Sequence, residues 1–225
     1  MNAFARIETP YTPVTPAIGR GADRLGETIG LAGARMRLER NAEIYGEGDA
    51  AEFVYRVVSG AVRISRVLID GRRQIGAFHL AGDVFGFEPG EEHRFSAEAV
   101  SDCEIVLIGR PALLALAARD GELARSLWEH ATADLARAHD HMVLLGRRSA
   151  TEKVATFLLD MAAREGSRDR IELPMSRYDI ADYLGLTIET VSRTLTQLES
   201  RRAIELTEAR RIALRDRGAL DRLAA

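Results

Sequence analysis

The stretch SRYDIADYLGLTIETVSRTLTQLES, residues 176–200, has the pattern of two short helices joined by a tight turn. Ser176 followed three residues later by Asp179 is a capping-box signature, which predicts that a helix begins here. Gly185 ends that helix, and Thr187 is a suitable N-cap residue for a second one. Two helices connected in this way indicate a helix-turn-helix, whose second helix enters the major groove of DNA.

The second predicted helix has one apolar face and one polar face. Its apolar residues recur at helical spacing and are Val191, Leu195 and Leu198. The opposite face, near the helix N-terminus, carries Glu189, Ser192, Arg193 and Thr196. Arg193 can donate two parallel hydrogen bonds to guanine and Glu189 can accept one from cytosine, so the pair favours a G·C base pair. The alternative is an ordinary ion pair between Glu189 and Arg193 on a solvated helix.

Residues 184–199, LGLTIETVSRTLTQLE, resemble the recognition motif of the CRP/FNR superfamily of bacterial transcription regulators. The E-x-x-S-R core, formed by Glu189, Ser192 and Arg193, is similar to the FNR and FixK branch. The cyclic-AMP receptor branch tends to carry arginine where this chain has Ile188. The similarity extends over roughly residues 35–217.

This resemblance implies a transcription activator that binds DNA as a homodimer and has RNA polymerase as a further partner. In the family the E-x-x-S-R positions face the bases, which implies a palindrome of the TTGAT-N4-ATCAA type. The candidate DNA-contacting residues are Glu189, Ser192, Arg193, Thr187, Thr190, Thr196, Arg177 and Arg211.

The composition is that of a packed globular protein. The 225-residue chain is 46% hydrophobic and 29% charged. The longest apolar run, residues 112–118, is too short to span a membrane, and residues 1–10 lack the apolar core of a signal peptide. We therefore expect a cytoplasmic protein without a membrane partner.

Charge differs between the two parts of the chain. Residues 1–146 contain 16 Lys and Arg against 21 Asp and Glu, whereas residues 147–225 contain 15 against 13. A mildly basic C-terminal module on an acidic N-terminal one suits a protein that reads DNA sequence and does not coat DNA.

The N-terminal half has the pattern of an antiparallel β domain. Residues 1–30 are rich in proline and glycine and lack periodicity, which predicts a flexible arm. From about Met36, short apolar runs alternate with turn signals such as Asp70-Gly71. This pattern is compatible with either an antiparallel barrel or a sandwich. The run from GEGD (46–49) through FVYRVVSG (53–60) to AGDVFG (81–86) resembles the cyclic-nucleotide-binding-type β-roll of the superfamily.

The β-roll is predicted to lack a working effector site. Cyclic-AMP-binding relatives hold the phosphate with an adjacent Arg-Ser or Arg-Thr pair, whereas FGFEPGEEHRFSAEAV (85–100) offers only Arg94 and Ser96, separated by Phe95. Three carboxylates in the same stretch would repel a phosphate, and they belong to Glu88, Glu91 and Glu92. We interpret Arg94 and Ser96 as a vestigial pocket, expect no cofactor, and expect His93 to be a surface residue.

A long helix is predicted to follow, from about Glu122 to Leu145. Its apolar residues follow alternating spacings of four and three, and they are Ala124, Trp128, Ala131, Leu135, Ala138, Met142 and Leu145. This heptad pattern is typical of a two-stranded coiled coil, although a helix packed on its own β-roll could also produce it. In the family this element forms the dimer axis, so the residues from Trp128 to Leu145 are the candidate dimer interface. His139 and His141 point to different faces, which argues against a metal site there.

The C-terminal segment is predicted to contain a small wing. Ser149 and Glu152 form a second capping box, and a hinge is expected at residues 146–149. After the recognition helix, IEL (204–206) and IAL (212–214) flank a turn at Arg210-Arg211. This hairpin predicts a wing whose arginines contact phosphates.

These features together predict an α+β protein: a flexible arm (1–30), a β-roll sensor-like domain (31–120), a dimerisation helix (121–146) and a winged helix-turn-helix domain (147–225). No catalytic or metal-binding motif appears, so an enzyme is not expected. One rival function is regulation that depends on a cyclic nucleotide. Another is redox sensing through Cys103, the only cysteine, although DCEIVLIG reads as a buried strand and a single cysteine cannot hold an iron–sulfur cluster.

Overall fold

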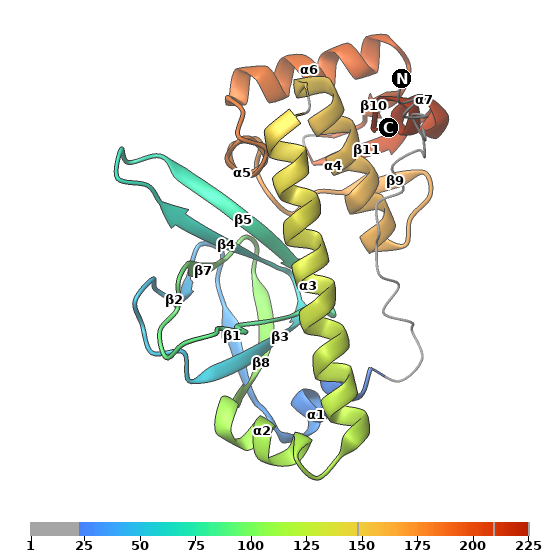
Figure 1. The fold of residues 1–225 in the computed structure, drawn as a ribbon. Helices are drawn as coiled ribbons and strands as arrows, with labels where there is room; N and C mark the ends of the chain where they lie inside the picture. Colours follow the sequence, from blue (N-terminus) through green and yellow to red (C-terminus); the bar gives the residue numbers. More distant parts are fainter. Residues whose placement is uncertain (1–22, 148, 209, 225) are drawn as a thin grey trace, which may run out of the picture.

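The computed structural model describes residues 23–147, 149–208 and 210–224. A β-roll is joined to a C-terminal helical module by one long helix, α3 (Gly121–Arg147), which runs along both (Figure 1). This arrangement confirms the predicted fold class of β-roll, long helix and winged helix-turn-helix. No helix in the described ranges is both long and apolar enough to cross a membrane.

The β-roll consists of two antiparallel sheets within the described residues. One sheet has the order β1 (Ala34–Leu38), β8 (Cys103–Gly109), β3 (Phe53–Ser59) and β6 (Val84–Phe85). The other has the order β2 (Glu43–Tyr45), β7 (Ser96–Ala99), β4 (Ala61–Val67) and β5 (Arg73–Leu80). The predicted Asp70-Gly71 hairpin is present: Val67 pairs with Arg73, and Gly71 has φ +81°, which glycine adopts without strain.

The first thirty residues are not all a flexible arm. Residues 1–22 lie outside the described part of the chain, but α1 (Arg24–Ala32) is a helix whose Leu25 and Ile29 are fully buried. A Cβ at Gly26 would lie 2.2 Å from Asp23 Oδ2 and 2.9 Å from Arg56 Nε, so glycine leaves room for both side chains. The prediction was wrong for α1 because its glycines lower helix propensity, while packing against α3 and the β-roll stabilises the helix.

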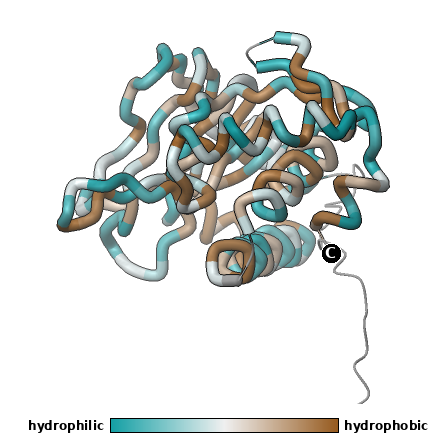
Figure 2. The backbone as a smooth tube through the Cα atoms, turned by 90° about the horizontal axis from the view of Figure 1, so that it is seen from above, coloured by the Kyte–Doolittle hydropathy of each residue, from teal (hydrophilic) through white to brown (hydrophobic). Residues whose placement is uncertain are grey.

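The C-terminal module begins with α4 (Ala150–Glu165), which has the predicted capping box at Ser149 and Glu152. The remaining elements are β9 (Arg170–Glu172), α5 (Arg177–Leu184), α6 (Ile188–Ser200), β10 (Ile204–Leu206), β11 (Arg211–Leu214) and α7 (Arg217–Ala224). The predicted wing hairpin forms as β10 and β11, and β9 extends it into an antiparallel sheet of order β10-β11-β9. Viewed from above, hydrophobic and hydrophilic segments alternate along the helices (Figure 2).

The hydrophobic core of the C-terminal module continues into the β-roll. Phe78 of β5 and Phe157 of α4 belong to one buried cluster, and the ring of Tyr183 on α5 contacts both of them. Ile75 of β5 is fully buried in the same cluster. The helix-turn-helix is therefore packed against the β-roll and against α4.

Candidate DNA-binding interface

Helix α5 starts and stops where the sequence predicts. The Ser176 N–H donates to Asp179 Oδ2 over 3.0 Å, and the Asp179 N–H donates to Ser176 Oγ over 3.1 Å, which completes the capping box. Gly185 ends the helix in the left-handed region at φ 60°. Thr187 Oγ1 then accepts a hydrogen bond from the Thr190 N–H over 3.3 Å and caps α6.

Helix α6 presents the predicted face to solvent. Val191, Leu195 and Leu198 are buried against α4 and α5. Glu189, Arg193 and Thr196 are exposed, and Thr190 and Ser192 are partly exposed. Amphipathic packing thus holds α6 with a polar ridge outward, as insertion into a major groove requires.

The exposed side chains of α6 are available to a ligand. Among the described residues no direct ion pair links Glu189 to Arg193, although the two charges still attract each other across the helix surface. The pKa of Glu189 is lowered by a hydrogen bond from its own backbone N–H, by the Thr187 hydroxyl and by the charge of Arg193. Glu189 is therefore ionised at neutral pH and can accept hydrogen bonds. The structure thus places one acceptor carboxylate and one guanidinium on the same exposed ridge.

Arg177 links the two helices of the motif. It is the first residue of α5, and its Nη1 atom donates to Ser192 Oγ over 3.4 Å. Thr196 Oγ1 donates to the Ser192 backbone oxygen over 3.1 Å. Arg177 and Thr196 therefore both contact Ser192, which lies next to Arg193 on α6.

The wing differs from the prediction in its electrostatics. Arg211 is not a free cation, because its Nε lies 3.3 Å from Glu172 and its Nη1 lies 3.0 Å from Glu208. The hydrogen bond to Glu172 and the charge of Glu208 raise the pKa of Arg211. Both carboxylates are exposed at the wing, so a phosphate contact by Arg211 would have to compete with them.

Helix α3 has one side that is buried and one that is exposed. Its β-roll side is buried through residues that include Leu123, Ala133 and Leu144. The opposite side exposes Trp128 (71%), Leu135 (56%) and Met142 (62%), the large residues of the predicted heptads. Ala124, Ala131 and Ala138 are exposed between them, and Leu145 is partly buried. The heptad residues are therefore not explained by packing on this chain's own β-roll, and an apolar stripe of this kind marks an interaction surface.

The two candidate effector residues, Arg94 and Ser96, contact different partners in this structure. The Arg94 side chain is 68% exposed, and its Nε atom lies 3.9 Å from Glu88 Oε2. Ser96 Oγ accepts a hydrogen bond from the Glu47 N–H over 2.9 Å. Arg94 and Ser96 thus each have their own partner within the β-roll.

A cleft of about 1020 Å³ lies between the β-roll, α3 and α4. Its arginines include Arg137 and Arg164, which already pair with Asp134 and Asp83. Among the described residues, no group of three or more His, Cys, Asp or Glu side chains could hold a metal ion.

His93 is buried, contrary to the prediction that it lies on the surface. It is 2% exposed, and its ring stacks on Tyr45 with centroids 3.5 Å apart and 6° between the planes. Neither ring nitrogen makes a hydrogen bond, but Nδ1 lies 3.6 Å from Glu88 Oε1. Stacking on the aromatic cluster of Tyr45, Tyr55 and Phe85 buries the ring, and local sequence pattern does not reveal such a contact.

Cys103 lies in β8 and is 5% exposed. Burial raises the pKa of its thiol, so the nucleophilic thiolate is disfavoured at neutral pH. This environment disfavours the redox-sensor alternative.

Comparison with known proteins supports this architecture. The family model for the Crp-like helix-turn-helix domain matches residues 152–223, and the model for the cyclic nucleotide-binding domain matches residues 35–120. The nitrogen fixation regulation protein FixK of Azorhizobium caulinodans is 53% identical over 205 residues, which cover 89% of this chain and 83% of the relative. FixK of Rhizobium meliloti is 48% identical over 170 residues, which cover 76% and 77%. The structure of FixK2 from Bradyrhizobium japonicum superposes with a TM-score of 0.83 at 50% identity and covers 86% of this chain and 98% of that one.

Proposed function

The chain belongs to the CRP/FNR superfamily as a FixK-like DNA-binding transcription regulator, and we propose that it is a homodimeric activator that needs no small-molecule effector. Its proposed site is a palindrome of the TTGAT-N4-ATCAA type. It would act in the cytoplasm, with RNA polymerase as its partner at the promoter.

The exposed ridge of α6 is the observation that carries the proposed base contacts. Arg193 is exposed and Glu189 is an acceptor, and both lie near the N-terminus of the helix. One guanidinium and one carboxylate on adjacent turns can read the two members of a G·C pair. Ser192, held by Arg177, lies between them on the same surface.

The apolar stripe of α3 supports the homodimer. Trp128, Leu135 and Met142 are each more than half exposed in the single chain. A second copy of α3 packed in register would bury them by coiled-coil packing. Twofold symmetry of the protein would then match the twofold symmetry of the palindrome.

The separate partners of Arg94 and Ser96 support effector independence, because neither side chain is held ready for a phosphate. The cleft beside α3 favours the rival hypothesis, in which a cyclic nucleotide controls binding. The buried Cys103 gives little support to control by oxidation.

Fluorescence anisotropy with a labelled TTGAT-N4-ATCAA duplex tests this proposal. The purified protein, treated with a chelator and given no nucleotide, should bind this duplex far more tightly than a scrambled one. Addition of cyclic AMP or a thiol oxidant should change the affinity less than about twofold, well below the coupling typical of an allosteric effector. A strict requirement for the nucleotide would establish the rival, and in vitro transcription with RNA polymerase would separate activation from repression.

A further inference from the structure

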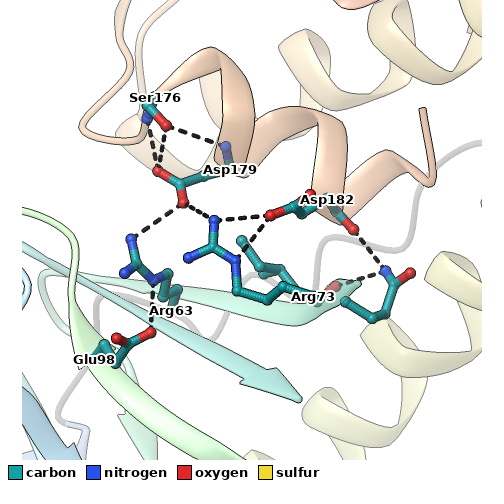
Figure 3. A network of polar contacts seen from close by, with 8 residues as sticks. Arg63, Arg73, Glu98, Ser176, Asp179 and Asp182 are labelled. Atoms are coloured by element: carbon teal, nitrogen blue, oxygen red, sulfur yellow. Dashed lines mark hydrogen bonds and ion pairs between the residues drawn. The ribbon is translucent and has the colours of Figure 1, made fainter. Parts of the chain in front are cut away.

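A cluster of charged and polar side chains joins the β4–β5 hairpin to helix α5; this Asp179 cluster comprises Arg63, Arg73, Glu98, Ser176, Asp179 and Asp182 (Figure 3). Arg63 Nη1 lies 3.1 Å and Arg73 Nη2 lies 2.7 Å from the same oxygen, Asp179 Oδ1. Both arginines belong to the β-roll, whereas Asp179 belongs to the helix-turn-helix. One carboxylate oxygen therefore binds two strands across the junction between the modules.

The other oxygen of the Asp179 carboxylate, Oδ2, binds within helix α5 itself. Asp179 Oδ2 accepts hydrogen bonds from the Ser176 N–H over 3.0 Å and from Ser176 Oγ over 2.7 Å. Burial alone would raise the pKa of Asp179, but the bonds from Ser176 and the charges of Arg63 and Arg73 outweigh it and lower the pKa. Asp179 thus fixes the start of α5 and, through its charge, ties that start to the β-roll.

The arginines are themselves held in place. The Arg63 side chain is 9% exposed, and its Nε donates to Glu98 of β7 over 2.9 Å. Arg73 Nε donates to Asp182 over 2.8 Å, and Gln74 Nε2 donates to the Asp182 backbone oxygen over 2.8 Å. A buried charge without its partner is costly, so this junction strongly favours one relative position of α5 and the hairpin.

Helix α3 ends at Arg147 and α4 begins at Ala150, so the recognition helix connects to α3 only through this link and through α4 and α5. Helix α6 follows α5 after a short turn and packs on it. The position of the recognition helix relative to the dimer axis therefore depends on contacts beyond the link.

We propose that Arg63, Arg73 and Asp179 are positioning residues that fix the recognition helix relative to α3 and so set the half-site spacing that the dimer accepts. The inference rests on the proposed function, since it assumes that a dimer reads a palindrome. In this mechanism an ion-pair cluster built into the fold holds the DNA-binding geometry without a bound small molecule. The recognition surface of α6 itself is unaffected, because none of the three residues lies on it.

Arg73 and Asp182 are partly exposed, so they can be substituted without changing the buried residues of the Asp179 cluster. Asp182→Asn removes one interdomain ion pair and Arg73→Gln removes two, those to Asp179 and Asp182, while the Ser176–Asp179 capping box keeps its own hydrogen bonds. Arg73→Lys keeps the charge. Arg72→Gln is the matched control, because Arg72 lies next to Arg73 but its guanidinium pairs with Asp70 at 2.7 Å. Anisotropy is measured on palindromes with the N4 spacer, with an N5 spacer, and with N4 but the G·C pairs swapped.

The wild-type protein should prefer N4 over N5, because one added base pair moves and rotates one half-site relative to the other. Arg73→Gln and Asp182→Asn should reduce this N4-to-N5 ratio by about five- to tenfold, while discrimination of the swapped duplex stays within about twofold. Arg73→Lys should recover part of the ratio, and Arg72→Gln should keep all of it. An unchanged ratio for Arg73→Gln, or an equal loss on every duplex, would overturn the inference.

If the wild-type protein failed to bind any palindrome, the proposed function would fail and a second measurement would decide the positioning role. Hydrogen exchange of full-length Arg73→Gln should then show faster exchange in α5 than in wild type, with α4 unchanged, because docking of α5 on the hairpin protects its amides. Equal exchange of α5 in both proteins would show that the cluster does not hold the modules together.

Discussion

His141 of α3 stacks on Tyr183 of α5 with ring centroids 4.0 Å apart and 12° between the ring planes. His141 Nε2 also lies 2.8 Å from the Tyr183 backbone oxygen. Burial lowers the pKa of His141, so the ring is neutral at neutral pH and its Nε2–H can donate to that oxygen. A neutral aromatic contact thus links the long helix to the helix-turn-helix, beside the charged contact at Asp179.

Replacing His141 with alanine should therefore lower the stability of the whole chain. Loss of the stacking and of the hydrogen bond to Tyr183 should reduce the free energy of unfolding by about 1–3 kcal/mol. Urea denaturation at a fixed protein concentration measures the change. His139→Ala is the control, because His139 is exposed on the same helix and its loss should cost less than about 0.5 kcal/mol. Equal effects of the two variants would contradict this role for His141.

Stability should also fall as the pH decreases below the ordinary histidine value of 6.5. Burial lowers the pKa of His79, His93 and His141, so the folded protein takes up protons on these rings only at lower pH than the unfolded chain does. The unfolded state then binds more protons, and this contribution to stability is present above pH 6.5 and lost as the pH falls through the folded-state pKa values.

His93 provides the sharpest test of this pH dependence. His93→Phe keeps the stacking on Tyr45 and removes two buried nitrogens, of which Nδ1 lies 3.6 Å from Glu88 Oε1 without a hydrogen bond. The variant should be as stable as wild type at pH 7 or more stable by about 1–2 kcal/mol, and should lose less stability at acidic pH. Thermal unfolding measured across a pH series compares the two proteins. A steeper pH dependence in the variant would mean that His93 is stabilised as a cation.

Local signals in the sequence were sufficient to place the elements of the DNA-binding site. The capping pair Ser176 and Asp179 and the stop at Gly185 act within a few residues, so their pattern is visible without the fold. The exposed face of α6 follows from helical periodicity alone. Helix α1 also had a signal in the spacing of Leu25 and Ile29, but its glycines masked it.

Contacts between distant segments were not predictable in this way. Asp179 has a local role that the sequence shows, but its bonds to Arg63 and Arg73 connect residues more than 100 positions apart. The burial of His93 depends on Tyr45 across the roll, and the ion pair of Arg211 depends on Glu172 in β9. The residues next to Arg63, Arg73, His93 and Arg211 in the sequence give no sign that these side chains have distant partners.

A substitution in the apolar stripe of α3 tests the proposed dimer. Leu135→Glu would place a charge within the seam, where it would be buried without a partner, so the variant should be monomeric at micromolar concentration. It should also bind the palindrome at least about tenfold more weakly, because it loses the second half-site. Light scattering and anisotropy measure the two effects. His139→Glu is the control, because it adds the same charge to the helix outside the apolar a and d positions and should remain a dimer. A dimeric Leu135→Glu variant would show that the interface lies elsewhere.

Arg211 of the wing should contribute to DNA affinity without contributing to sequence choice. Arg211→Ala removes a cation and leaves the carboxylates of Glu172 and Glu208 unpaired near the DNA phosphates. Because these carboxylates repel phosphate whatever the base sequence, the variant should bind all duplexes more weakly. The slope of log affinity against log salt should become shallower by about one phosphate contact. Glu208→Gln should have the opposite effect on affinity, because it releases Arg211 from one competing carboxylate. A change in the preference for the G·C pair in either variant would be inconsistent with a phosphate contact.

Arg193 should behave in the opposite way, because one side chain on α6 meets one base pair in each half-site. Arg193→Ala removes a bidentate donor to guanine, which should cost about 1–3 kcal/mol per half-site and relax discrimination at that G·C pair. The salt dependence should remain nearly unchanged, since no phosphate contact is lost. Binding isotherms at several salt concentrations on TTGAT-N4-ATCAA and on its G·C-swapped form provide the comparison. If Arg193→Ala lost the same affinity for both duplexes, Arg193 would be a phosphate contact, and the assignment of the α6 ridge to the base edges would have to be abandoned.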